Sequence, residues 1–245
     1  GGVKAIMTLI AKFILKMNIN LKLSNKVFRP TGTSEILFKS AVKLIKKSSK
    51  ILDLGCGSGY VGISIEKNTK NKNKLYFSDV SKFATKLTKI NSKKNKIKAI
   101  IKNGSLFEPW KGYKFNIIVN DVSGISQELN KISPWYNENI TNFSGRDGTN
   151  LTMRFLKESS NYLEKRGLII FPIISLSNYK KVLSFTKKKF KIVKKIDSKS
   201  WPLPKEMYKY KKKIDFLSKK KLIFIEKKFG LILFKTDIYL AKNNG

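Results

Sequence analysis

The chain has 245 residues, enough for one large α/β domain, and its 41% hydrophobic content can fill a sizeable core. It carries 52 lysine and arginine residues against 16 acids, a formal net charge of +36, which favours an anionic partner such as RNA, a ribosome or an anionic membrane surface. The lack of histidine excludes a histidine-based triad or metal site, and the single cysteine excludes an internal disulfide and a thiolate zinc cluster. These counts predict a reducing, cytoplasmic setting and no metal site.

The first segment with a regular pattern is an amphipathic helix over residues 3–17, in which lysine or threonine recurs every four residues. It is too short and too regularly charged to span a bilayer. We interpret residues 1–25 as a helical extension that packs on the domain, with a membrane-surface or partner helix as the alternative. Residues 26–245 are then one domain with no membrane span.

From residue 34 onward, segments with helical spacing alternate with short apolar runs typical of strands. Helices are expected at residues 34–46, 60–67, 82–91 and 151–163, and strands at residues 51–54, 75–78, 97–101, 115–120 and 167–174. This alternation predicts an α/β fold with a mainly parallel sheet. Two further strands, at residues 221–225 and 230–234, are expected to form an antiparallel edge hairpin.

A glycine-rich turn follows the first strand, in the sequence Asp53-Leu-Gly-Cys-Gly-Ser-Gly59. Gly55, Gly57 and Gly59 allow the backbone to turn sharply and to approach a ligand closely, with the amides of the next helix facing it. Asp53, at the end of the strand, can accept hydrogen bonds or attract a cation. Cys56 is interpreted as a small space-filling residue.

Two cofactors compete for this turn. Residues 57–62 satisfy the G-x-G-x-x-G dinucleotide pattern, and Asp79 lies 20 residues beyond Gly59. The turn already begins at Gly55, however, and the Asp53 carboxylate would repel a pyrophosphate. A cationic sulfonium ligand with a ribose suits Asp53 better, and Asp79 is placed to accept hydrogen bonds from both ribose hydroxyls. The residues therefore favour S-adenosylmethionine over NAD(P).

The segment Asp53–Gly59 resembles the first motif of class I, Rossmann-like methyltransferases. More closely, the chain resembles the HemK-type glutamine N5-methyltransferases and their relatives that act on RNA amino groups. Four further stretches follow in the family's order: Phe28–Glu35, Tyr76–Ala84 with Asn91, Asn103–Glu108 and Ser144–Thr149. The resemblance covers residues 26–175 and implies a mainly parallel twisted sheet with an antiparallel C-terminal hairpin. It also implies an S-adenosylmethionine site formed by Asp53, Gly55, Cys56, Gly57, Gly59, Asp79, Ser105, Leu106 and Asn120.

The chain departs from the family at two places. Ser105, a weaker acceptor, stands where the family has an acid at the adenine turn. The family's Asn-Pro-Pro-Tyr loop, whose asparagine accepts hydrogen bonds from a planar NH2 group and whose aromatic ring stacks on the substrate, is Asn120-Asp-Val-Ser-Gly124 here. We predict Asn120 and Asp121 as the catalytic residues, because a carboxylate is a strong acceptor; the alternative is that they only cap the turn. Candidates for a replacement stacking surface are Trp110, Trp135, Tyr136 and Trp201.

The resemblance implies an S-adenosylmethionine-dependent N-methyltransferase that modifies a planar amide or amino nitrogen of a translation-associated protein, such as a release-factor glutamine, or of RNA. Only about 25 residues precede the core, so the family's helical release-factor docking domain is expected to be reduced. The 19 lysines of residues 180–228 predict a nucleic-acid contact, although the scarcity of arginine leaves compositional drift open. The alternatives are a non-catalytic RNA-binding scaffold that kept the fold and a small-molecule methyltransferase.

Overall fold

The computed structural model describes residues 19–69, 72–122, 124–136 and 144–243. Within these ranges one sheet contains the strands β1 Lys50–Leu54, β2 Lys74–Asp79, β3 Ala99–Asn103, β4 Phe115–Asn120, β5 Leu163–Ile174, β6 Ile192–Pro202, β7 Glu226–Lys228 and β8 Leu231–Lys242. The α-helices are α2 Gly32–Leu44, α3 Tyr60–Asn68, α4 Lys82–Lys94, α5 Gln127–Asn130, α6 Asn150–Ser159, α7 Tyr179–Lys189 and α8 Lys211–Lys219, with 3-10 turns η1 Glu108–Trp110, η2 Ser160–Tyr162 and η3 Lys205–Tyr210. The helix predicted at residues 3–17 lies outside the described residues.

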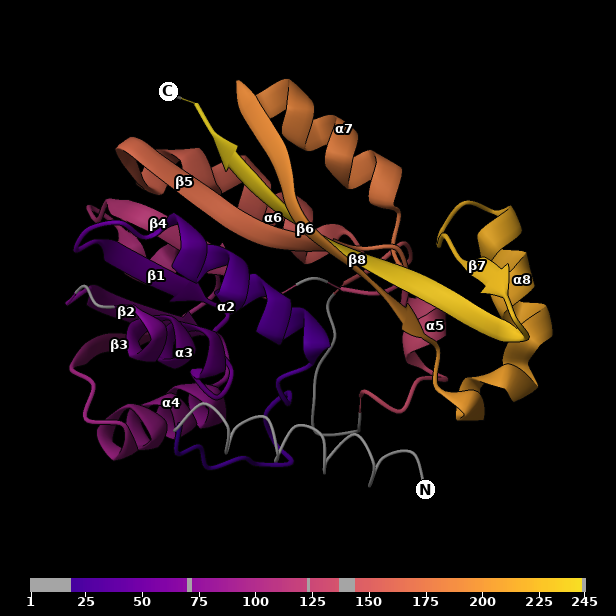
Figure 1. Ribbon diagram of the computed structural model, residues 1–245, viewed down its shortest axis with the longest axis horizontal. Helices are drawn as coiled ribbons and strands as arrows, with labels where there is room; N and C mark the ends of the chain where they lie inside the picture. The colour runs from indigo at the N-terminus through magenta and orange to yellow at the C-terminus, as the bar shows by residue number, and fades with distance from the viewer. Residues whose placement is uncertain (1–18, 70–71, 123, 137–143, 244–245) are drawn as a thin grey trace.

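The sheet has the strand order β3-β2-β1-β4-β5-β8-β6, and β7 pairs with the outer part of β8 (Figure 1). The strands β1 to β5 are parallel to one another, whereas β8 is antiparallel to both β5 and β6. The predicted α/β class, mostly parallel with antiparallel C-terminal strands, is confirmed. The chain leaves β1 toward β2 on one side and returns to β4 on the other, and open α/β sheets bind ligands at the carboxyl ends of strands at such a switch point.

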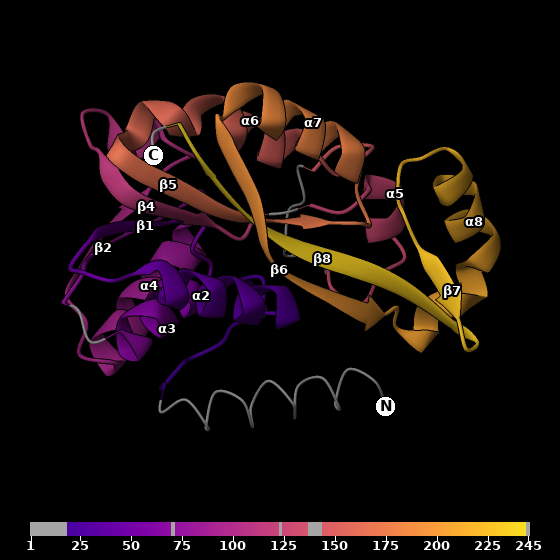
Figure 2. The same cartoon turned by 45° about the horizontal axis from the view of Figure 1, so that its top comes forward.

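Helices cover both faces of the sheet, with α2, α3 and α4 on one face and α6 and α7 on the other (Figure 2). The central strands β1 and β4 are buried along almost their whole length, which explains their nearly continuous apolar sequences. Helix α4 is amphipathic: Ala84 and Leu87 are buried, whereas Lys86 and Lys89 face water. In the described ranges, no helix is long and apolar enough to cross a membrane.

The C-terminal third differs from the prediction. Residues 221–225, expected as a strand, form a turn and irregular backbone, and the first strand of the hairpin is β7. The second strand, β8, continues to Lys242 and lies inside the sheet between β5 and β6 rather than at its edge. Strand β6 was not expected, because as the edge strand it is mostly half-buried or exposed and its sequence is rich in lysine and serine. Its lack of a buried face removes the apolar alternation that would reveal it.

Trp110 lies in the apolar core on the face of the sheet that α6 and α7 cover. Its side chain has no exposed surface, and its indole Nε1 donates a hydrogen bond of 2.8 Å to the hydroxyl of Ser78. The ring meets Tyr76 and Phe115 edge-on, with centroid separations of 5.8 Å and 5.6 Å. Trp110 therefore belongs to the core and cannot supply an exposed stacking surface.

Replacing Trp110 with alanine should lower the free energy of unfolding by about 3–5 kcal/mol, because it leaves a large cavity and an unpaired Ser78 hydroxyl. Trp110→Phe should cost less, since it keeps most of the ring contacts and loses the hydrogen bond. Urea denaturation at 25 °C measures both values. A loss below about 1 kcal/mol for the alanine variant would contradict this account of the core.

Candidate active site

The turn after β1 is pinned to the end of β2 by its backbone. The amides of Gly55 and Cys56 both donate to the Ser78 carbonyl, at 2.8 Å and 2.9 Å. Gly55, Gly57 and Gly59 all have positive φ, at 73°, 55° and 79°, a region that residues with a Cβ rarely adopt. The three glycines thus form the sharp turn that the sequence predicts.

The loop after β4 lies directly against this turn. Leu54 pairs with Asn120 in the β1–β4 register, so both strands end at the same edge. A Cβ atom on Gly55 would lie 1.9 Å from Cγ2 of Val122, so only glycine permits this approach. On the other side of the loop, a Cβ on Gly124 would lie 2.0 Å from the hydroxyl of Ser144. Val122 and Gly124 therefore each lie in close contact with a neighbouring turn.

Asp53 links the end of β1 to the start of α3. Its carboxylate is 2% exposed, and Oδ2 accepts a hydrogen bond of 2.8 Å from the amide of Gly62, in the first turn of the helix. Burial raises the pKa of Asp53 to about 7, and the nearby carboxylates of Asp121 and Asp79 add to this rise. Among the described residues, those that shift the pKa of Asp53 include no lysine or arginine that would balance its negative charge.

Asp79, at the end of β2, is held by backbone amides on two sides. Oδ2 accepts from Gly57 at 3.0 Å, and Oδ1 accepts from Ser81 at 2.8 Å. Burial is the largest cause of its raised pKa, and these hydrogen bonds act in the opposite direction. The side chain of Asn103 donates to the Asp79 carbonyl at 2.8 Å, which ties the turn after β3 to this position.

The turn after β3 brings Ser105 and Leu106 toward the end of β2. The amide of Ser105 donates to a carboxylate oxygen of Glu108 at 3.2 Å, and Leu106 has a φ of 44°. Next to this turn, Val80 is 63% exposed and Phe83 is 55% exposed. This apolar surface is not among the predicted site residues, although Val80 directly follows Asp79 in the sequence.

Asn120 is fixed at the end of β4, with 2% of its surface exposed. Its Nδ2 donates to the Leu54 carbonyl at 3.4 Å, and its Oδ1 accepts from the amide of Val122 at 3.2 Å. Val122 stands where the family's loop has its second proline, which has no N–H to donate. The substitution thus engages the very oxygen that the resemblance assigns to the substrate.

Asp121 adds a second acceptor beside Asn120. Its Oδ2 accepts a hydrogen bond of 2.5 Å from the hydroxyl of Ser34, whose oxygen in turn accepts from the amide of Thr31 at 3.0 Å. Burial raises the pKa of Asp121 to about 7, against this hydrogen bond. Ser34, at the start of α2, is not among the predicted site residues, because no local sequence pattern links α2 to β4.

Among the remaining aromatic candidates, Tyr136 lies beside the Asp121 carboxylate. Burial, with a contribution from Asp121, raises the pKa of Tyr136 to about 12. The Tyr136 ring also lies 5.1 Å from the ring of Phe28. Trp135 packs on Phe234, with ring centroids 5.5 Å apart, and Trp201 covers Gly32, where a Cβ would lie 2.3 Å from the indole. Tyr136 is therefore the best placed of the four to face a substrate.

Cys56 lies inside the glycine turn and is buried. Its Sγ is 3.3 Å from the hydroxyl of Thr88 on α4, and burial raises the pKa of the thiol well above its ordinary value. A thiol held in its neutral form fits the space-filling role and is a poor nucleophile.

The strand order and the glycine turn at the switch point define the Rossmann-like class of methyltransferases. Residues 31–121 match the family model described as the methyltransferase small domain. The chain is 31% identical over 167 residues to the "Putative protein N5-glutamine methyltransferase" of Methanocaldococcus jannaschii, a match that covers 68% of this chain and 81% of the relative. The chain therefore belongs to this family of methyltransferases.

Two further matches extend the comparison. The chain is 32% identical over 162 residues to the release factor glutamine methyltransferase of Borreliella burgdorferi, covering 63% of this chain but only 55% of the longer relative. A methyltransferase of known structure from Pyrococcus furiosus aligns with a TM-score of 0.60 at 12% identity, over 99% of this chain and 98% of that chain. The structural match supports the fold.

The raised pKa of Asp121 predicts how stability depends on pH. The folded pKa is about 7, against an ordinary 3.8, so the folded protein binds a proton that the unfolded chain releases, and stability falls as the pH rises through this interval. Asp121→Asn cannot ionise, so its loss of stability between pH 5 and pH 8 should be smaller than that of the unmodified protein. Urea denaturation at both pH values measures this difference. Equal losses would show that Asp121 does not titrate in this interval; Asp53 should supply the remaining dependence.

Proposed function

We propose that this chain is an S-adenosylmethionine-dependent N-methyltransferase that modifies the side-chain amide nitrogen of a glutamine in a protein substrate, with residues 26–245 as one catalytic domain. The observation that carries this proposal is the placement of two acceptors, Asn120 and Asp121, against the glycine turn at the β1–β4 switch point. Both acceptors lie where a reacting group and a cofactor would meet.

The chemistry of the site fits S-adenosylmethionine. The carboxylates of Asp53, Asp79 and Asp121 all have pKa values raised by burial, so a cation bound among them would offset the cost of their charge. The cofactor would be held by Asp53 and the backbone of Gly55, Cys56, Gly57 and Gly59, by Asp79 at the ribose hydroxyls, by Ser105 and Leu106 at the adenine, and by Asn120. When bound, it supplies a methyl carbon activated by a positively charged sulfur.

The role of the protein is to orient a weak nucleophile. An amide nitrogen reacts poorly because its lone pair is delocalised, and acceptors that bind its N–H groups help to localise that pair. Asp121 is the stronger acceptor, because Asn120 Oδ1 already receives the Val122 amide. When nitrogen forms its bond to carbon it must lose a proton, which the Asp121 carboxylate can accept. Ser34 holds this carboxylate in place.

The aromatic pair of Phe28 and Tyr136 takes over part of the role of the family's loop tyrosine. A planar amide can lie against the Tyr136 ring while its N–H groups point to Asp121. The protein-glutamine relatives favour the glutamine amide over an RNA amino group as the substrate.

Asp79→Ala should weaken binding of S-adenosylhomocysteine by about 100-fold, because the hydrogen bonds to two ribose hydroxyls are lost. Isothermal titration calorimetry measures the affinity. Glu206→Ala, which removes an exposed acid on η3, is the matched control and should leave the affinity unchanged. No heat from the unmodified protein at millimolar ligand would refute the cofactor assignment.

At saturating S-adenosylmethionine, Asn120→Ala and Asp121→Asn should both lower turnover, Asp121→Asn by about 100-fold, because each variant loses an acceptor for the substrate N–H groups. The assay follows labelled methyl groups from S-adenosylmethionine into a cognate lysate treated with nuclease or with protease. We expect protease to remove the label and nuclease to leave it. Label that nuclease removes would assign an RNA amino group as the substrate instead.

A further inference from the structure

The segment between β6 and the middle of β8 packs around an apolar cluster that it shares with α5, and we call this segment the C-terminal lobe (residues 203–235). It contains η3, α8 and β7, and in Figure 1 it lies beyond the end of the main sheet. Its side chains bury an apolar cluster of Leu203, Met207, Ile214, Leu217, Ile223 and Ile232. The lobe is therefore a folded unit whose surface residues have defined positions.

The lobe stands next to the candidate active site. Thr236 of β8 pairs with Ile174 at the carboxyl end of β5, so residues 231–235 extend beyond the edge where the parallel strands end. Ile125 and Leu129, which follow the Asn120–Gly124 loop, pack into the apolar cluster of the lobe. A partner bound to the lobe would thus reach the same edge of the sheet as Asn120.

Lysine is concentrated in this lobe. Eleven of its 33 residues are lysine, against 37 of the other 212 residues, and it contains three acids. One of these acids, Asp215, pairs with Lys227 at 2.7 Å, and Lys213 pairs with Glu128 outside the lobe at 2.9 Å. If lysine had accumulated evenly along the chain by compositional drift, the lobe would not contain about twice the fraction of lysine found in the other residues.

Exposed aromatic rings accompany these lysines. Phe216 on α8 is 54% exposed, and Phe229, at the tip of the β7–β8 hairpin, is 90% exposed. The ammonium groups of Lys220 and Lys228 lie 5.7 Å and 5.3 Å from the respective ring centres. Phe229 also has a φ of 52°, a conformation that costs energy for a residue with a Cβ. Rings beside ammonium groups match bases that stack next to phosphates.

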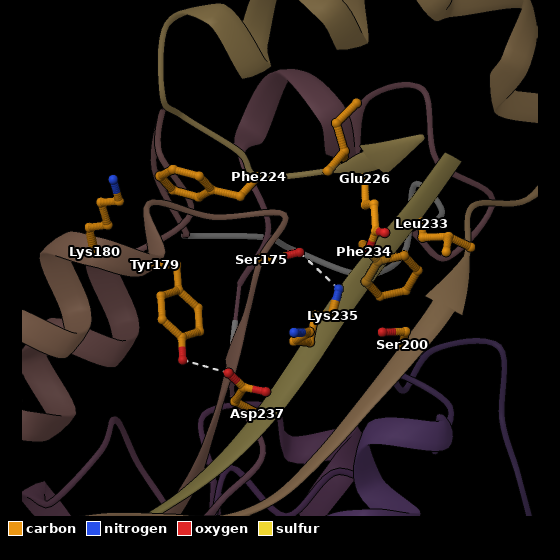
Figure 3. A pocket seen from close by; sticks show the side chains of 11 residues that line it. Ser175, Tyr179, Lys180, Ser200, Phe224, Glu226, Leu233, Phe234, Lys235 and Asp237 are labelled. Atoms are coloured by element: carbon orange, nitrogen blue, oxygen red, sulfur yellow. Dashed lines mark hydrogen bonds between the residues drawn. The ribbon is translucent and has the colours of Figure 1, made fainter. Parts of the chain in front are cut away.

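The junction of the lobe with the main sheet is hollowed (Figure 3). A cavity of about 300 Å³ is lined by residues that include Lys180, Lys235, Phe224 and Phe234. The carboxylate of Asp237 at its wall accepts hydrogen bonds from Tyr179 at 2.6 Å and from Ser198 at 2.5 Å, and lies 3.6 Å from the ammonium of Lys195. Its charge is thus compensated within the protein. Glu226 also lines the cavity, so the two lining lysines leave an excess of one positive charge that can attract an anion.

We propose that the C-terminal lobe binds single-stranded RNA, with lysines on the phosphates and exposed phenylalanines on the bases, and so docks the methyltransferase beside its substrate. Only the docking role rests on the proposed function, because it requires that the protein is a methyltransferase with a substrate. The binding surface itself stands on the charge, the exposed rings and the cavity.

The test uses the full chain and a fluorescein-labelled single-stranded oligouridine of about 12 nucleotides, within the site sizes of such surfaces. The lobe variant neutralises three exposed lysines, K212Q/K220Q/K228Q. The control removes the same charge from exposed positions on α4, K86Q/K89Q/K93Q. Fluorescence anisotropy at several salt concentrations gives the dissociation constant and its salt dependence.

The lobe variant should bind at least about tenfold more weakly and should reduce the slope of log affinity against log salt by about 2, whereas the α4 variant should change neither. Phe229→Ala should weaken binding about fivefold or more with an unchanged slope, because it removes stacking and no charge.

Equal weakening by the two triple variants would overturn the proposal, because it would assign binding to the net charge of the whole protein. Displacement of the RNA by polyglutamate of equal charge, together with no effect of Phe229→Ala, would also overturn it and indicate an acidic protein partner. Calorimetry with S-adenosylhomocysteine separates the two proposals, since the lobe variants should keep full cofactor affinity. RNA binding without methyl transfer would refute the proposed function and leave the lobe assignment intact.

Discussion

The burial of Asp53, Asp79 and Asp121 is the constraint on which the site depends. Each carboxylate lies at the end of a parallel strand or directly after it, and each accepts hydrogen bonds from a neighbouring turn or helix start: Gly62 to Asp53, Gly57 and Ser81 to Asp79, and Ser34 to Asp121. These bonds position the acids but leave desolvation as the largest influence on all three pKa values. A cation bound at this edge of the sheet would therefore offset the cost of burying these carboxylates, an argument that does not depend on the glycine pattern.

In the loop after β4, the replacement of the second proline by Val122 makes the replacement of the first by Asp121 more important. With Val122 in place of a proline, a backbone N–H becomes available and donates to Asn120 Oδ1. The strongest remaining acceptor is Asp121, which the family's loop lacks and which Ser34 orients from α2. The loss of two prolines also removes local stiffness, yet Val122 packs closely on Gly55 and Gly124 packs closely on Ser144. Tertiary contacts thus replace what the prolines supply.

Local patterns predict the central part of this fold well and its periphery poorly. The apolar strand β1, its glycine turn and Asp79 are specified within short segments, so their places in the sequence predict their places in space. Strand β6 could not be predicted in the same way, since an edge strand has little buried surface and its lysines and serines carry no alternation. The contact of Ser34 with Asp121 joins residues 87 positions apart, and Phe28 meets Tyr136 only through the fold. The site residues that the sequence missed are those that depend on such long-range packing.

The net charge of +36 and the carboxylate-lined site act over different distances. Most lysines in the described part of the chain are exposed to solvent, where salt screens their field beyond about 8 Å at physiological ionic strength. The buried carboxylates act in a medium of lower dielectric constant, in which a nearby cation gains several times more Coulomb energy than it does in water. A cationic cofactor can therefore bind at the edge of the parallel strands even though the protein as a whole is strongly basic. The lysines of the C-terminal lobe attract anions instead. Because salt screens their field, this attraction acts only on anions close to the lobe, which lies at the same edge of the sheet. The two regions would thus keep the proposed cationic cofactor and the proposed anionic partner at separate places on the protein.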